Sequence, residues 1–247
     1  MRWKYTRNGH DWTERYPLII ESAQRIDCRS ALIDGEICVQ NEHGVTDFAA
    51  LPAAIRNDPG SLIFFAFDLL HLDGDDLRSQ PLEERRAKLR WMLDGNDARL
   101  HISDEYSGNG KAFFELVDRM GLEGVVSKKK GSRYVSGNAR TWLKTKCWNV
   151  SEFEVIGVER DKTGIPCALL ADEAGYRGMA FIALPAALRN AFWRYVGDRS
   201  VEKPVFPSLR KKGTTWLTPG MRASVRYLKG SDKLRHATVQ TIAIGKD

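Results

Sequence analysis

Two short stretches, Glu123-Gly-Val-Val-Ser-Lys128 and Trp142-Leu-Lys-Thr-Lys146, decide how this chain is expected to fold. Strands are predicted at Gly124–Lys128 and Thr141–Lys146. Residues two apart on a strand share a face, so Lys144 and Lys146 should point the same way. Two ammonium groups on one face repel each other unless an anion lies between them, and a phosphate there gains charge-assisted hydrogen bonds. No acidic residue occurs between Glu123 and Glu152. Taken alone, Lys-x-Lys is common and favours a solvated basic strand, with a phosphate site as the functional alternative.

Two glutamates next to glycines are candidate metal ligands. Glu36 follows Asp34-Gly35, and Glu123 precedes Gly124. Glycine allows a ligand or another backbone to approach closely, and carboxylate oxygens suit a hard ion such as Mg²⁺. For each residue taken singly, a glutamate in a surface turn is the commoner case.

An aromatic candidate lies in the apolar segment Phe64-Phe-Ala-Phe-Asp68. Core packing is the default for Phe67 in such a strand. The functional alternative is a platform for a purine base, because every base has a π-face.

Composition describes an ordinary globular protein of 247 residues, with 43% hydrophobic and 28% charged residues. No apolar run approaches the ~20 residues that a membrane span requires. Four scattered cysteines with no Cys-x-x-Cys pair argue against a zinc site or a disulfide framework. Residues 148–247 hold 16 Lys and Arg against 10 Asp and Glu, whereas the rest of the chain is neutral. This bias suits a polyanion such as nucleic acid, or a solvated basic face.

The arrangement of elements predicts an α+β fold in two domains. The first part alternates apolar strands at 31–40 and 61–70 with helices at 81–93 and 110–120, followed by the two basic strands. After Trp148, short β segments near 153–159, 168–171, 179–182 and 223–228 surround one helix near 185–195. Several short strands with one helix are typical of an OB-fold barrel, so we expect a boundary near 147–152.

The ordered series of motifs resembles the ATP-dependent DNA ligases, and in particular the ligase domain of bacterial end-joining enzymes. Any single motif is weak, but their order is specific. The segments that carry the resemblance are Thr6–Thr13, Leu32–Glu36, Ala66–Gly74, Pro81–Arg86, Gly121–Val126 and Thr141–Lys144, with a fainter continuation at Trp216–Pro219 and Leu234–His236. The resemblance implies an adenylation (nucleotidyltransferase) domain of antiparallel sheets with flanking helices at 1–147, N-terminally incomplete, and an OB-fold domain at 148–247.

Roles for individual residues follow from the resemblance. It implies that Phe67 stacks on the adenine of ATP or AMP, and that Glu36 contacts the ribose or helps to place Mg²⁺ or Mn²⁺. Glu123 is the second implied metal ligand. The implied phosphate-binding and catalytic lysines are Lys128, Lys144 and Lys146, with Arg7 as a further nucleotide contact and with Arg210, Lys211, Lys212 and Arg235 as DNA contacts. We expect the six residues Glu36, Phe67, Glu123, Lys128, Lys144 and Lys146 to converge.

One family motif is not found. The first motif, Lys-x-Asp-Gly, supplies the lysine that ATP adenylates, and no such sequence occurs in the 247 residues. Lys4 lacks the neighbouring Asp and Gly. After Arg235 the tail contains Lys246, but it lacks the arginine that the last motif of the family contains. We therefore expect no stable adenylate with ATP, but sealing of a nick whose 5′ end already carries AMP.

Three functions stay open at this stage. The first is an ATP-dependent DNA ligase, or a truncated relative, that acts in DNA repair and recombination on nicked or broken duplex DNA. An end-binding protein such as Ku is the implied partner, and the bacterial cytoplasm, near the nucleoid, is the implied location. The second is an RNA ligase or a capping-type nucleotidyltransferase, which shares the motif order. The third is a non-catalytic nucleic-acid-binding protein that retains the scaffold.

Overall fold

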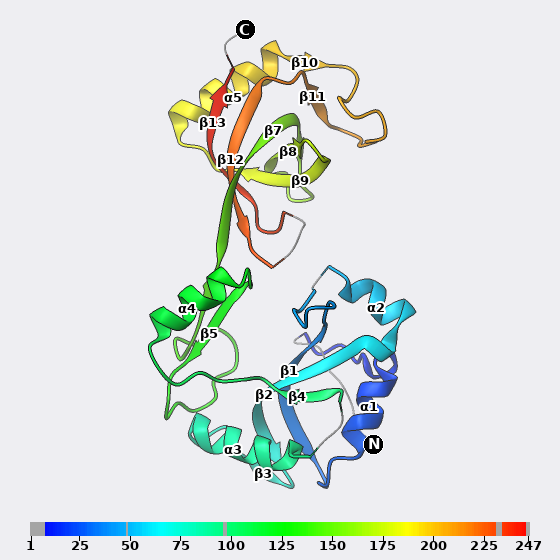
Figure 1. The fold of residues 1–247 in the computed structure, drawn as a ribbon, viewed down its shortest axis with the longest axis vertical. Helices are drawn as coiled ribbons and strands as arrows, with labels where there is room; N and C mark the ends of the chain where they lie inside the picture. The colour runs from blue at the N-terminus through cyan, green and yellow to red at the C-terminus, as the bar shows by residue number, and fades with distance from the viewer. Residues whose placement is uncertain (1–7, 48, 96–97, 231–233, 246–247) are drawn as a thin grey trace. The chain divides into compact units, whose positions relative to one another are not determined.

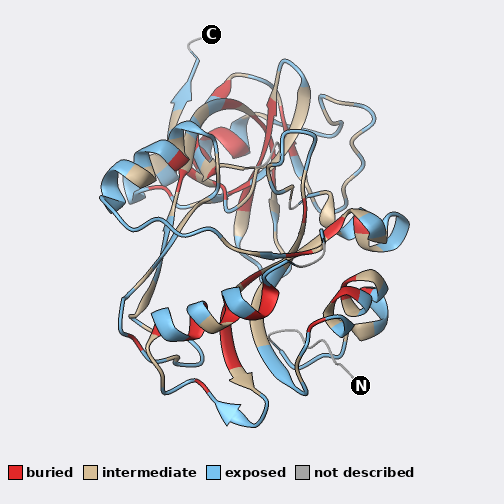
Figure 2. Ribbon diagram, turned by 60° about the horizontal axis from the view of Figure 1, so that its bottom comes forward, coloured by how far each residue is buried: buried red, intermediate tan, exposed pale blue. Residues whose placement is uncertain are grey.

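The computed structural model describes residues 8–47, 49–95, 98–230 and 234–245, which form two compact units (Figure 1). The first unit contains the described residues up to Arg119 together with Gly124–Thr145. The second contains Met120–Glu123 and the described residues from Lys146 onward. Each unit has its own buried core (Figure 2). The segment Met120–Glu123 thus belongs to the second unit although it precedes the boundary expected from the sequence.

The first unit is built on a sheet with the strand order β1–β2–β3, and β4 lies beside β2. β1, β2 and β3 pair antiparallel, whereas β4 pairs parallel with β2. One face of β2 is buried against the helices, where Leu62, Leu69 and Leu89 are fully enclosed. Each such leucine contributes about 1.5–3 kcal/mol by burial. The elements are η1 (Thr13–Arg15), α1 (Pro17–Gln24), β1 (Ala31–Val39), α2 (Leu51–Asn57), η2 (Pro59–Ser61), β2 (Leu62–Leu72), β3 (Asp75–Asp76), α3 (Leu82–Leu93) and β4 (Leu100–Ile102).

Where β1 pairs with β2, position 35 has no room for a side chain larger than that of glycine. The pairing register shifts between Asp34 and Gly35, and a Cβ atom on Gly35 would lie 2.2 Å from the Phe64 ring and 2.7 Å from the Phe65 carbonyl oxygen. The close approach that the sequence suggested is therefore made by the ring of Phe64 in the same unit. This packing fixes the two strands over which the candidate site is built.

The basic strands form a separate two-stranded sheet after helix α4 (Gly110–Arg119). β5 spans Gly124–Lys128 and β6 spans Trp142–Lys146, within one residue of the ranges predicted from the sequence. Gly124 has φ 149°, a conformation that side-chain-bearing residues rarely adopt. The connecting segment returns so that the Lys129 N–H donates to the Thr141 carbonyl at 2.8 Å.

The second unit is a closed five-stranded barrel. β7 pairs with β12, β12 with β13, β13 with β9, β9 with β8, and β8 again with β7. Only the β9–β13 pair is parallel. Closure leaves none of these five strands as an open edge, and the single long helix between β9 and β12 is the OB-fold arrangement. The elements are β7 (Trp148–Arg160), β8 (Pro166–Asp172), β9 (Gly175–Ile182), α5 (Ala186–Asp198), β10 (Ser200–Val201), β11 (Thr215–Leu217), β12 (Met221–Leu228) and β13 (Thr238–Ile244).

The predicted fold class is confirmed, with several additions. Helices α1 and α2 and the three-residue strand β4 were not expected, because segments this short hold too few periods to give a clear pattern. Strand β13 was also missed. A register shift opposite it, between Ser224 and Val225, interrupts the alternation of apolar and polar residues. No helix among the described residues has the length and apolar character needed to cross a membrane.

Candidate functional site

The β1–β2 pair carries two of the predicted site residues. Glu36 lies opposite Phe65 in the register, and opposite residues of an antiparallel pair share a face. Phe67 is the extra residue of β2 at the register shift, between Ala66 opposite Gly35 and Asp68 opposite Asp34. Glu36 is exposed and Phe67 is half-buried.

Lys128 reaches Phe67 from β5. Its Nζ donates a hydrogen bond to the Phe67 carbonyl at 3.0 Å. The same ammonium lies 4.6 Å from the Phe67 ring centroid and 3.7 Å from that of Trp142, and the two rings meet edge to face. Burial lowers the pKa of Lys128 to about 8, and the nearby Asp68 carboxylate partly opposes this effect. Lys128 is therefore a desolvated cation held between two aromatic rings.

A buried ion pair joins β2 to α3. Asp68 and Arg85 are both fully enclosed and form a bidentate pair, with both nitrogen–oxygen distances 2.8 Å. The remaining Arg85 donor bonds the carbonyl oxygens of Gln80 at 2.6 Å and Ser132 at 3.0 Å. The pair thus ties the segment that follows β5 to the first sheet and helps to position Lys128.

A second arginine of α3 supports the same strand. Arg86 donates to the Phe67 carbonyl at 2.9 Å and to the Ser103 carbonyl at 2.8 Å, and it pairs with Glu105 at 2.9 Å. The Phe67 carbonyl therefore accepts from both Arg86 and Lys128. This double contact fixes the backbone that carries the Phe67 ring.

Tyr134 links the loop after β5 to the carboxylate beside Glu36. Its hydroxyl donates to Asp34 at 3.1 Å, and its ring meets Trp142 edge to face. Burial raises the pKa of Asp34, although the Tyr134 hydrogen bond opposes that shift. Burial together with the Asp34 charge raises the pKa of Tyr134 to about 12. Asp34 is consequently a structural acceptor for Tyr134, whereas Glu36 is directed to solvent.

Of the six residues expected to converge, four belong to the first unit: Glu36, Phe67, Lys128 and Lys144. Lys144 is exposed and, by the two-residue period of β6, shares a face with Trp142. The other two, Glu123 and Lys146, belong to the second unit. Arg7 lies outside the described residues.

Glu123 and Arg235 form a contact of their own within the second unit. Arg235 Nη1 lies 3.0 Å from Glu123 Oε2, and the Glu123 carbonyl accepts from the Cys147 N–H at 2.8 Å. An expected metal ligand and an expected DNA contact are thus paired with each other. The described residues contain no group of three or more His, Cys, Asp or Glu side chains that could hold a metal ion.

The basic run near residue 211 divides into two roles. Lys211 pairs with Glu159 at 2.7 Å, and Thr214 donates to the same carboxylate at 3.1 Å. Arg210 and Lys212 are exposed. In this run, therefore, only Arg210 and Lys212 present their charges fully to solvent.

Several residues of this site were not assigned a role from the sequence: Asp34, Asp68, Arg85, Arg86, Tyr134 and Trp142. A signal did exist for Arg85. It lies three residues after Leu82 and four before Leu89, so it belongs to the apolar stripe of the helix. An arginine is buried in such a stripe only when an acidic residue is buried with it. No comparable signal identifies the partner of Tyr134, 100 residues away in the sequence.

Comparison with known proteins identifies the family. A family model described as "ATP dependent DNA ligase domain" matches residues 3–146, more than half of the chain. The chain belongs to the ATP-dependent DNA ligase family. The Pseudomonas aeruginosa "Multifunctional non-homologous end joining protein LigD" is 34% identical over 240 residues, covering 90% of this chain and 28% of that protein. The chain therefore spans little more than a quarter of this relative.

Two solved ligase structures match nearly the whole chain. The ligase domain of M. tuberculosis LigD is 26% identical with a TM-score of 0.56, and the match covers 97% of this chain and 81% of that one. A mycobacterial DNA ligase D complexed with ATP and MES is 27% identical with a TM-score of 0.56, covering 98% of this chain and 82% of that one. The resemblance drawn from the motifs is confirmed.

Proposed function

We propose that this chain provides the nucleotidyltransferase and OB-fold parts of an ATP-dependent DNA ligase that seals nicked or broken duplex DNA in end joining. The main support is the position of Lys128 between Phe67 and Trp142, with Lys144 on the Trp142 face of β6. Aromatic rings suit a purine base, and adjacent lysines suit its phosphates. ATP or AMP is therefore the proposed nucleotide, in keeping with the ATP complex of the mycobacterial relative.

The proposed roles divide between base, phosphate and metal. Phe67 stacks on the base, and Lys128, Lys144 and Lys146 hold phosphates. Glu36 contacts the ribose or the metal. Glu123 is a further proposed ligand for Mg²⁺ or Mn²⁺, and Arg7 is a further nucleotide contact. The donor set fits a divalent ion, because exposed carboxylates and phosphate oxygens are the ligands that such ions prefer. A metal at Glu123 would require its ion pair with Arg235 to open.

The substrate, partner and location that we propose are inferred from the similarity to the LigD relatives. Duplex DNA with a nick or break is the proposed substrate, with Arg210, Lys212 and Arg235 as contacts of the basic second unit. Lys211 and Arg235 are weaker candidates because Glu159 and Glu123 pair with them. An end-binding protein such as Ku is the proposed partner, and the bacterial cytoplasm the proposed location.

Sealing of a pre-adenylated nick tests this proposal directly. The step requires a DNA 3′-hydroxyl to displace AMP, so the protein must supply position and charge rather than a nucleophile of its own. We expect product with Mg²⁺ and a much slower reaction in Lys128→Met, with Lys130→Met as the matched exposed control. With labelled ATP we expect no protein-bound label. Folded protein that binds nicked DNA but never seals it would refute the enzymatic proposal and favour the non-catalytic scaffold.

A further inference from the structure

The outer face of the barrel between β7 and β12 carries aromatic, basic and acidic side chains in a row. In the pairing register Val150 lies opposite Arg226, and Glu154 lies opposite Arg222. Trp148 precedes Val150 by two residues and shares its face. Arg226 is therefore diagonal to Trp148 across the two strands, which brings its long side chain within reach of the indole.

Two cations flank the indole at one end of this face. The Arg226 guanidinium carbon lies 4.5 Å from the Trp148 ring centroid, and Lys146 Nζ lies 5.9 Å from the same centroid. Neither cation has a carboxylate within 4.0 Å among the described residues. Both charges act on one small area, where an anion would relieve their mutual repulsion.

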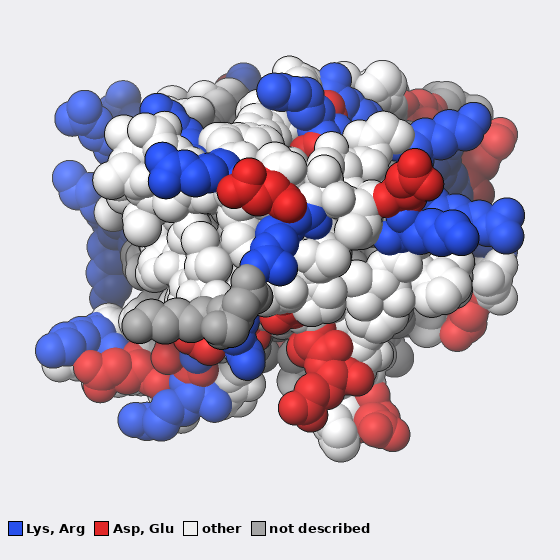
Figure 3. Space-filling model, turned by 90° about the horizontal axis from the view of Figure 1, so that it is seen from above, with Lys and Arg blue, Asp and Glu red and all other residues white. Residues whose placement is uncertain are grey.

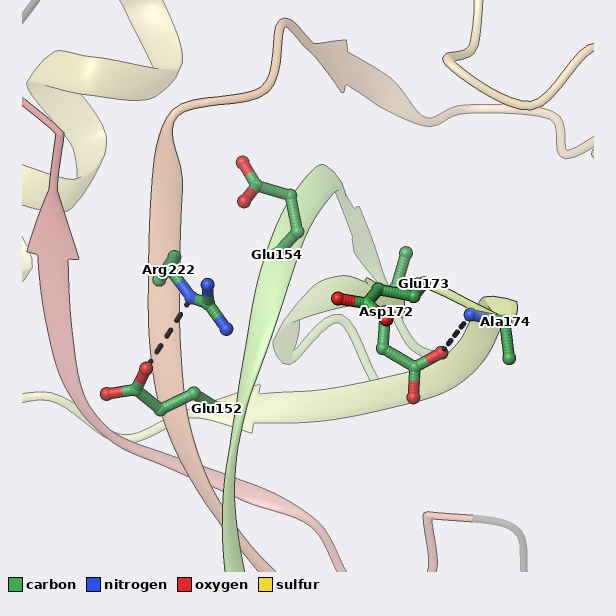
Figure 4. Close-up of a pocket in the computed structure, with 7 residues that line it drawn as sticks. Glu152, Glu154, Asp172, Glu173, Ala174 and Arg222 are labelled. Atoms are coloured by element: carbon green, nitrogen blue, oxygen red, sulfur yellow. Dashed lines mark hydrogen bonds and ion pairs between the residues drawn. The ribbon is translucent and has the colours of Figure 1, made fainter.

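The other end of the same face is acidic. Glu152, Glu154, Asp172 and Glu173 line a pocket together with Arg222 (Figure 4). Arg222 Nε lies 3.5 Å from Glu152 Oε2, so its charge already has a partner. Arg222 and Arg226 lie four residues apart on one strand and one face, yet only Arg226 is left for an external anion. The face shown in Figure 3 likewise mixes blue and red groups, so the charge is local rather than one uniform field.

We propose that Trp148 and Arg226, beside Lys146, form a contact site for the phosphodiester backbone of a DNA strand, an inference that rests on the proposed ligase function. Arg226 holds one backbone phosphate, and the indole supports the adjoining sugar or base. Lys146, which is proposed above for the nucleotide phosphates, adds its positive charge at the edge of this site. Val150, 61% exposed, continues this end of the sheet as an open surface. An open surface suits a passing strand, whereas a free nucleotide is usually held in a concave pocket. The acidic end repels phosphates and limits the strand to the Trp148 end.

The test compares two arginines of β12 in the full chain. Binding of a fluorescent nicked duplex is measured by anisotropy between about 50 and 200 mM salt. Arg226→Gln should weaken binding about tenfold at the lowest salt and reduce the slope of log affinity against log salt by about 0.9. Arg222→Gln should leave both quantities close to those of the wild type. Trp148→Leu should weaken binding, and Trp148→Phe should retain most of it.

Three results would overturn the inference. An unchanged salt slope in Arg226→Gln, or equal losses in Arg222→Gln and Arg226→Gln, would show that no discrete phosphate contact exists. A loss of AMP affinity in Arg226→Gln as large as its loss of DNA affinity would assign the site to the nucleotide. In each of these cases wild-type binding and sealing of nicked DNA would still stand. Absence of wild-type binding at every salt concentration would overturn the proposed function as well.

Discussion

Breaking the buried ion pair between Asp68 and Arg85 should destabilise the first unit by at least about 3 kcal/mol. In Arg85→Met the Asp68 carboxylate loses two donors at 2.8 Å and, among the residues that the structure describes, keeps only the Leu69 N–H at 2.9 Å. The carbonyl oxygens of Gln80 and Ser132 lose their donor too. Both side chains of the pair are fully buried, so water does not replace these contacts. Removing one partner of such a pair typically costs about 3–5 kcal/mol.

Hydrogen exchange followed by mass spectrometry is the appropriate assay, because two units need not unfold together. A loss of about 3 kcal/mol reduces protection in β2 and α3 roughly 100-fold, and the barrel peptides should be unaffected. Arg25→Met is the matched control. Arg25 pairs with Glu21 at 3.3 Å on the surface, and such a pair contributes at most about 0.5 kcal/mol.

A double variant separates the charge from the loss of packing. Adding Asp68→Asn to Arg85→Met should recover part of the lost stability, because it removes the uncompensated carboxylate. If Arg85→Met costs less than about 1 kcal/mol, or if Asp68→Asn gives no recovery, the reasoning about this pair is wrong.

Three further predictions concern the candidate contacts. Lys144→Ala should weaken ATP or AMP binding more than tenfold relative to Lys129→Ala in calorimetry, because a charge-assisted hydrogen bond contributes ~1.5–3 kcal/mol; equal losses would indicate only a diffuse basic field. Nucleotide affinity should fall as the pH rises through about 8, because burial lowers the pKa of Lys128 to about 8 and only its protonated form attracts phosphate. The absence of this fall in Lys128→Arg would support this origin, and an identical fall would exclude it. Lys211→Met should increase hydrogen exchange in the segment 202–214, because the ion pair with Glu159 is lost. Lys212→Met should leave hydrogen exchange in that segment unchanged.

The sequence alone determined several of the longer regular elements and the family. Apolar runs and alternating patterns located β1, β2, β5, β6 and α3, because the periods of strands and helices are local properties of the chain. The order of the ligase motifs, from Leu32–Glu36 to Thr141–Lys144, identified the family before any contact was known. Charge counts also located the basic excess after Trp148.

Tertiary structure alone decided which side chains meet. Lys128 contacts the Phe67 carbonyl across 61 residues of sequence, and Tyr134 contacts Asp34 across 100. The structure also showed that the glycine of the Asp34–Glu36 motif accommodates Phe64.

The same holds for the second unit, where Arg222 and Arg226 look equivalent in the sequence. The fold gives Arg222 an acidic neighbour and places Arg226 against the Trp148 indole. A local pattern fixes the direction of a side chain along its own strand or helix, but its partner is chosen by the pairing register and by packing between distant segments. These depend on the whole folded chain, and for that reason the charged pairs and the aromatic contacts of Lys128 emerged only from the structure.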